Sequence, residues 1–189
     1  MKKGKAILHG VSALCSVLVF AFFALPFYTI KVAPAQLATV AKAAGVPVGN
    51  TNGYQFLETA LRESNGSALA TFTAMMALFT LIVAGVVLVA AIFALLTDFA
   101  VIKNQKVATI ANWVVLCVTV LLAVFAILNL IGNACFVAND LPDRLADAKA
   151  GLAYYGASLK IVAGWALTII VSVLSLGAAG TSIAAKFQK

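Results

Sequence analysis

The stretch from Ala68 to Thr97 reads ALATFTAMMALFTLIVAGVVLVAAIFALLT and contains no Asp, Glu, Lys, Arg or His. An α-helix rises about 1.5 Å per residue and the hydrocarbon core of a bilayer is about 30 Å thick, so about 20 apolar residues cross it. A helix that is apolar on every side must be buried in protein or lipid. A chain of 189 residues has too little other material to bury this one, so the stretch predicts a transmembrane helix.

The composition of the whole chain is typical of a polytopic membrane protein. Hydrophobic residues make up 63% of the sequence and charged residues 10%, against about 45–50% and about 25% in globular domains. In a soluble protein the net charge of +7 would suggest a nucleic-acid partner. Here the basic residues lie mainly at the ends of apolar runs, where they set orientation and contact anionic lipid headgroups. We therefore expect the lipid bilayer, and no nucleic acid, as a partner.

Three further apolar runs predict a bundle of four transmembrane helices. The spans are placed at about residues 6–30, 68–97, 107–132 and 157–185. The first span is longer than the 7–15 apolar residues of a cleaved signal peptide and ends in Leu25-Pro26-Phe27-Tyr28, without an Ala-x-Ala pattern. We therefore expect it to be retained. The chain 1–189 is interpreted as a single integral membrane domain.

The segments between the spans predict a small cap on one side of the membrane. Outer loops are placed at about 31–67 and 133–156, and a short inner loop at about 98–106. The first outer loop combines a β-branched stretch at 27–32, an amphipathic helical pattern at 35–44, turn residues at 45–53 and a helical pattern at 54–63. In the second, Asp140-Leu141-Pro142-Asp143 predicts a helix start. The fold class is an all-α membrane protein, a four-helix bundle with an extracytoplasmic cap of short helices and a candidate short β-strand.

Charge counting predicts that both termini are cytoplasmic. In that orientation the inner segments carry seven basic residues and one acidic residue, a balance of +6, and the outer segments six basic and five acidic residues, a balance of +1. The inner basic residues also lie in much shorter segments beside the spans, which is what the positive-inside rule weighs. We expect a multi-pass protein of the plasma (cytoplasmic) membrane.

Polar and small residues inside the spans are the candidate helix-packing or pore-lining positions. Asn129 stands out, because an unpaired carboxamide in hydrocarbon is costly. It predicts an interhelical hydrogen bond or, alternatively, a contact with a lumen or substrate. The fourth span supplies small residues that let helices approach closely, and these are Gly164, Ser172, Ser175, Gly177 and Gly180.

The outer loops supply a second set of candidates, for contact with other molecules. These are Tyr54, Phe56, Asp140, Asp143 and Asp147. The three aspartates share a helix face at spacings of three and four, and a solvated face is favoured over a cation site because basic residues accompany them. Two consecutive tyrosines, 154 and 155, are interpreted as marking the membrane interface.

No catalytic, cofactor or metal site is expected. No ionisable side chain stands in the middle of a span, as proton relays, coupled transporters and voltage sensors require. His9 is the single histidine, and we interpret it as a satisfied or solvated imidazole at the inner interface. The three cysteines show neither CxxC nor Cys/His spacing and predict neither a metal site nor a disulfide framework. GxSxG and HExxH motifs are also absent from the sequence.

The overall order of segments resembles the claudin-like tetraspan arrangement: four spans, both ends inside, a long structured first outer loop, a short inner loop and a smaller second outer loop. The resemblance is one of topology. Claudins carry a Trp/Gly-Leu-Trp pattern and two cysteines in the first loop, whereas residues 31–67 contain neither Trp nor Cys. No functional residue is therefore carried over.

The sequence favours a non-enzymatic structural or accessory subunit. Its outer loops and helix faces would contact copies of itself or a larger membrane complex. The alternative is a homo-oligomeric channel, in which Asn129 and the threonines of the spans face a lumen between subunits.

Overall fold

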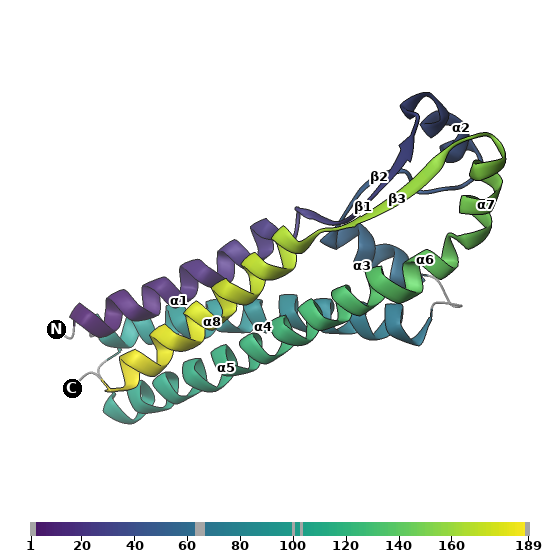
Figure 1. Cartoon of the computed structure of the whole chain (residues 1–189). Helices are drawn as coiled ribbons and strands as arrows, with labels where there is room; N and C mark the ends of the chain where they lie inside the picture. The colour runs from purple at the N-terminus through teal and green to yellow at the C-terminus, as the bar shows by residue number, and fades with distance from the viewer. Residues whose placement is uncertain (1–2, 63–66, 100, 103, 188–189) are drawn as a thin grey trace.

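The protein was analysed as a computed structural model, which describes residues 3–62, 67–99, 101–102 and 104–187. Four of its helices are long and apolar enough to cross a membrane. Figure 1 shows them side by side, with both termini at one end of the bundle and the cap at the other. These helices are α1 (Lys3–Phe22), α4 (Ala68–Asp98), α5 (Gln105–Cys135) and α8 (Trp165–Phe187). The predicted class, a bundle of four apolar helices, is confirmed.

The four helices form a closed ring of neighbours, in the order α1, α4, α5, α8 and back to α1. Small residues line its interior, because lipid tails are as apolar as leucine and helices in a bilayer must gain stability from close contact. In α4 the buried face is largely alanine: Ala70, Ala74, Ala77, Ala84, Ala91 and Ala94.

Hydroxyl groups join α1 to α8 inside the ring. Ser12 is fully buried, and its Oγ lies 2.7 Å from Thr181 Oγ1 and 3.2 Å from Ser182 Oγ. It also lies within donating distance, 3.3 Å, of the Ala178 carbonyl oxygen. Ser12 therefore makes its side-chain contacts within the chain.

A three-stranded antiparallel sheet rises from the bundle in the order β2–β1–β3. Its strands are β1 (Pro26–Ala33), β2 (Gly49–Asn52) and β3 (Ser158–Ala163). Figure 1 shows β1 leaving α1 and β3 leading into α8, so the sheet extends the bundle outwards. The candidate strand at 27–32 is confirmed, as part of β1.

Both strands that adjoin the bundle shorten the predicted helices. The first helix ends at Phe22 and not near residue 30, because Pro26 provides no backbone donor and the residues after it are largely β-branched or aromatic. The fourth helix begins at Trp165 and not near residue 157. Residues Ser158–Ala163 pair with β1 instead, and Tyr28 lies opposite Ala163 at the bundle end.

Strand β2 lies inside the segment 45–53, for which the sequence predicted only a turn. Its four residues, Gly-Asn-Thr-Asn, have low strand propensity. Pairing with β1 supplies the hydrogen bonds that hold it, and the register places Gly49 opposite Ile30. Tertiary pairing, which local sequence does not encode, decides this element.

Short helices complete the cap. The patterns at 35–44 and 54–63 are confirmed as η1 (Ala35–Leu37) followed by α2 (Ala38–Ala43), and as α3 (Gly53–Arg62). The second outer segment continues α5 through a π-helical turn, η2 (Phe136–Asp140), into α6 (Leu141–Arg144) and then α7 (Ala146–Tyr154). Helix α6 begins at Leu141 with Asp140 at its N-cap position, as the sequence predicts, but the chain is already helical at Asp140 and this side chain makes no capping hydrogen bond.

An aromatic cluster fixes the cap to the bundle. Phe27 stacks on Phe56 with ring centroids 4.3 Å apart. The ring centroids of Phe56 and Phe136 are 5.2 Å apart. These rings come from β1, α3 and the outer continuation of α5, and all three are buried. Two backbone contacts reinforce the junction: Gly53 N–H donates to the Phe23 carbonyl and Gly164 N–H to the Phe27 carbonyl. The cap is thus continuous with the hydrophobic core of the bundle.

Candidate functional site

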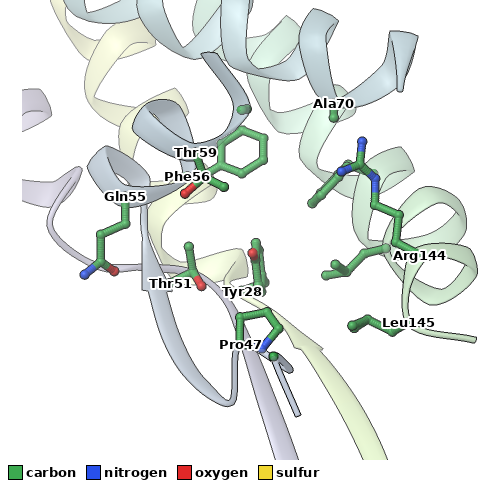
Figure 2. A pocket seen from close by; sticks show the side chains of 13 residues that line it. Tyr28, Pro47, Thr51, Gln55, Phe56, Thr59, Ala70, Arg144 and Leu145 are labelled. Carbon is green, nitrogen blue, oxygen red and sulfur yellow. The ribbon is translucent and has the colours of Figure 1, made fainter. Parts of the chain in front are cut away.

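The cap contains an open pocket of about 530 Å³, a volume in the range of ligand and partner-anchor sites. Figure 2 shows one wall carrying Tyr28, Thr51 and Phe56, and the opposite wall carrying Arg144 and Leu145. The first wall comes from the sheet and α3, and the second from η2 and the helix that follows it. The lining residues are Tyr28, Gly45, Pro47, Thr51, Gln55, Phe56, Thr59, Ala60, Ala70, Phe136, Leu141, Arg144 and Leu145.

The pocket combines apolar walls with a few polar groups. Aromatic rings and leucine side chains provide the apolar area, while Thr51, Gln55 and Thr59 offer hydrogen-bond donors and acceptors. Arg144 is the one ionised group among the lining residues, and its Nε–H donates to Asp140 Oδ2 at 2.9 Å. This set suits the binding of an apolar group with a polar edge more than acid–base chemistry.

Two adjacent tyrosines protrude at the outer tip of the cap. Tyr154 is 87% exposed and Tyr155 is 69% exposed, and their rings meet edge to face at 5.4 Å. They end α7 just before β3, whose six residues span about 20 Å before the chain reaches α8. The strand β3 carries this pair away from the bundle (Figure 1), so the two tyrosines do not lie at the end of a spanning helix.

Of the predicted contact residues, the two aromatic ones attach the cap to the bundle. Phe56 is a core residue, 3% exposed, and one face of it lines the pocket. Tyr54 is partly exposed, and its hydroxyl donates to the Phe20 carbonyl at 2.7 Å. Burial raises the pKa of the Tyr54 phenol, so the hydroxyl keeps the proton that this bond needs.

The predicted aspartates do not converge on a common point. Asp140 pairs with Arg144, whereas Asp143 and Asp147 are exposed on the outer helices. Across the described ranges, no three His, Cys, Asp or Glu side chains come close enough to hold a metal ion. Cys15, Cys117 and Cys135 are free thiols.

The small residues of the fourth span divide into three environments. Ser172 Oγ donates to the Ala126 carbonyl of α5 at 3.2 Å, and Ser175 Oγ donates to the Val171 carbonyl of its own helix. Gly177 and Gly180 are exposed on the outer face of α8. Gly164 precedes the helix, where it lies against the backbone of Pro26 and Phe27.

Asn129 lies in the interior of the four-helix ring. Its side chain is fully buried, and neither amide atom has a hydrogen-bond partner. One turn further along α5, Asn133 is also buried and donates from Nδ2 to the Phe27 carbonyl at 3.3 Å. The two asparagines therefore differ: the second connects α5 to β1, and the first forms no interhelical bond among the described residues.

Replacing Asn129 by leucine should raise the free energy of unfolding by roughly 1–3 kcal/mol, because an unpaired buried amide costs about that much and an apolar side chain of similar size does not. Asn133→Leu, the matched variant, should lower it, because the bond to Phe27 is lost. Reversible unfolding by SDS in mixed micelles would measure both. A large loss of stability in Asn129→Leu would show that this amide has a partner in the folded protein.

Sequence reasoning missed a buried pair at the terminal end of the bundle. His9 Nδ1 lies 2.7 Å from Asp98 Oδ2, with side-chain exposures of 2% and 6%. The imidazole was expected to be satisfied or solvated, and it is satisfied, by a residue 89 positions away. The pocket wall formed by Tyr28, Thr51 and Thr59 was also missed, since no local pattern marks residues that meet only when β1, β2 and α3 pack together.

Comparison of the chain with protein-family models, with curated proteins and with solved structures finds no match.

Proposed function

We propose that the protein is a non-enzymatic membrane protein whose cap binds another protein, as a structural or accessory subunit. The bundle anchors the cap, and the cap presents the contact surface. The partner is a second copy of this chain or a member of a larger membrane complex. Both termini are cytoplasmic in this proposal, and the cap stands outside the plasma membrane.

The exposed pair of Tyr154 and Tyr155 is the observation that carries this proposal. Tyrosine supplies a large, rigid contact area at low entropic cost and is enriched at protein interfaces. At the end of β3 that is far from the bundle, the chain leaves most of the surface of both tyrosines uncovered. They therefore mark a surface that gains stability when a partner covers it.

The cap pocket adds a site for an anchoring side chain. Interface hot spots pair a large side chain with a well-packed pocket that excludes water. The aromatic walls formed by Tyr28, Phe56 and Phe136, with Thr51 and Gln55 at hydrogen-bonding positions, fit an aromatic or long aliphatic side chain of a partner.

The homo-oligomeric channel has less support. Asn129 and four threonines of the spans, Thr73, Thr80, Thr119 and Thr168, are buried inside the single chain. The threonine hydroxyls donate to carbonyls of their own helices. Away from the helix ends, the exposed large side chains of the spans are mainly apolar, as at Val89, Leu121 and Val173, so the middle of a lumen between copies would be lined by apolar groups.

Site-directed cross-linking in intact cells tests the proposal. A cysteine replaces the exposed Ala153, beside the tyrosine pair, in a Cys135→Ser chain, and a membrane-impermeant thiol reagent with a photoreactive arm is added from outside. We expect a cross-linked product of discrete mass, to this chain or to another. The further change of Tyr154→Ser and Tyr155→Ser should reduce its yield by about tenfold or more, because hot-spot side chains contribute about 2 kcal/mol or more.

The label provides its own control. Glu58→Cys, exposed on α3 at the bundle end of the cap, should be labelled without giving this product. Labelling of residue 153 only after permeabilisation would overturn the orientation. Equal cross-linking with and without the tyrosines would overturn the contact surface.

A further inference from the structure

A second pocket, of about 180 Å³, lies at the terminal end of the bundle, away from the cap. Its walls come from three helices that are distant in sequence: Lys5 from α1, Lys186 from α8, and Thr109, Asn112 and Trp113 from α5. The volume is below the roughly 300–1,000 Å³ of sites for drug-sized ligands. It suits a compact group such as a phosphate.

The two lysines give this pocket a positive charge that no carboxylate of the described residues neutralises. Neither ammonium group forms an ion pair with any residue that the structure describes. Asp98 is the one acidic residue outside the two outer-loop segments of the sequence, and its carboxylate is bound to the buried His9. Among the described residues, an anion entering the pocket would therefore meet two positive charges and no carboxylate paired with them.

The remaining lining residues suit a phosphate at a membrane surface. Lys186 Nζ lies 3.2 Å from the centre of the Trp113 ring, which holds the ammonium group in place. The Asn112 Oδ1 atom is buried without a hydrogen-bond partner, and rotation of the amide would present its N–H donors in that position. The Thr109 hydroxyl donates to the Gln105 carbonyl of its own helix at 3.0 Å, and it would have to rotate to donate to a bound anion.

The surroundings of the pocket favour a lipid over a soluble anion. Trp113 is half exposed at the end of a predicted span, the position of interfacial tryptophans. Large apolar side chains are exposed beside it on both helices, namely Ile110 and Val114 on α5 and Ile183 on α8. Acyl chains would lie along this surface while a headgroup occupies the pocket, and basic pockets between transmembrane helices bind anionic headgroups in this way.

We propose that this pocket binds the phosphate of an anionic phospholipid headgroup, with Lys5 and Lys186 as its charge partners and Trp113 as its wall on the bilayer side. The site is independent of the cap and of the partner protein. It would favour anionic lipid over zwitterionic lipid at one defined place on the protein surface.

Quenching of Trp113 by brominated lipids tests the proposal on the full chain. The sequence contains two tryptophans, so Trp165→Phe leaves Trp113 as the sole tryptophan, which is excited at a wavelength that tyrosine does not absorb. The protein is reconstituted in mixtures of phosphatidylglycerol and phosphatidylcholine, with bromine on the acyl chains of one or the other. We expect phosphatidylglycerol to be preferred at Trp113 by about threefold or more, and high salt to weaken the preference.

The double variant Lys5→Gln/Lys186→Gln should lower this preference to about one. Each preference is a ratio within one variant, so changes in the intrinsic emission of Trp113 cancel. Lys31→Gln/Lys160→Gln removes the same charge from facing positions of β1 and β3 and should leave the preference unchanged. Lys5→Arg/Lys186→Arg should retain it, which separates loss of charge from loss of fold.

Three outcomes would overturn the proposal. They are no preference in the parent chain, an equal loss of preference in the Lys31/Lys160 control, and abolition of the preference by inorganic phosphate at an ionic strength where sodium chloride has no effect. The last result would assign the pocket to a soluble phosphate.

Discussion

Replacing Gly164 by alanine should lower the free energy of unfolding by about 3 kcal/mol, the upper range for overpacking a well-packed site. An added Cβ would overlap the Pro26 carbonyl oxygen and lie 2.6 Å from that of Phe27. Both obstacles are backbone atoms, so no side-chain rotation relieves the clash. The strands must separate, and the Gly164 N–H bond to Phe27, 2.9 Å long, is lost.

Unfolding by SDS, followed by Trp165 fluorescence beside the substituted position, would measure this effect. Gly180→Ala is the matched control, because no heavy atom lies within 4 Å of its added Cβ and alanine favours a helix over glycine by about 1 kcal/mol. Equal stability of the two variants would show that the cap does not approach the start of α8 as closely as the structure describes.

Replacing His9 by alanine should lower the free energy of unfolding by roughly 3–5 kcal/mol, the cost of leaving one partner of a buried pair alone. The variant keeps Asp98 with a side-chain exposure of 6% and removes its contact, 2.7 Å away. Because the two residues lie on α1 and α4, the lost bond also loosens the seam between these helices. Ile7→Ala, at an exposed position on the same turn of α1, should cost far less.

A double-mutant cycle separates the pair from its surroundings. Its four members are the parent chain, His9→Leu, Asp98→Leu and His9→Leu/Asp98→Leu. The double variant removes both polar groups and should be more stable than His9→Leu, because no unpaired carboxylate remains. The same SDS titration gives the four free energies. Additive losses from the two single changes would mean that the two side chains do not interact in the folded protein.

Some features of the fold were predictable because they depend on the composition of a contiguous stretch. Transfer of a segment into lipid is a sum over its residues, so the run 68–97 identifies α4 without reference to the rest of the chain. Helical spacing identified α2 and α3 for the same reason, since i, i+3 and i+4 neighbours interact within one helix. The predicted end of the first helix and the predicted start of the fourth were wrong. At 26–30 and 157–163, apolar residues that adjoin the spans belong to the strands or their connections and not to the helices.

The candidate sites were less predictable than the fold. Tyr54 and Phe56 were predicted as contacts with other molecules, and in the structure both attach the cap to the bundle. Gly164 was assigned to helix packing, although its requirement for glycine comes from the backbone of β1, 137 positions away by the Phe27 contact (164 minus 27). The sequence shows that residue 164 is small, but it does not show which distant backbone atoms pack against it in the fold.

The sequence alone determined that this is a bundle of four apolar helices with a small cap, because hydrophobicity and helical periodicity are properties of neighbouring residues. Only the tertiary structure decided the pairing of β1 with β2 and β3, the His9–Asp98 contact and the residues that line the two pockets. Each of these joins segments that are distant in the chain. The stability of these contacts depends on which surfaces meet after folding, and the composition of one segment does not determine which distant segment it meets.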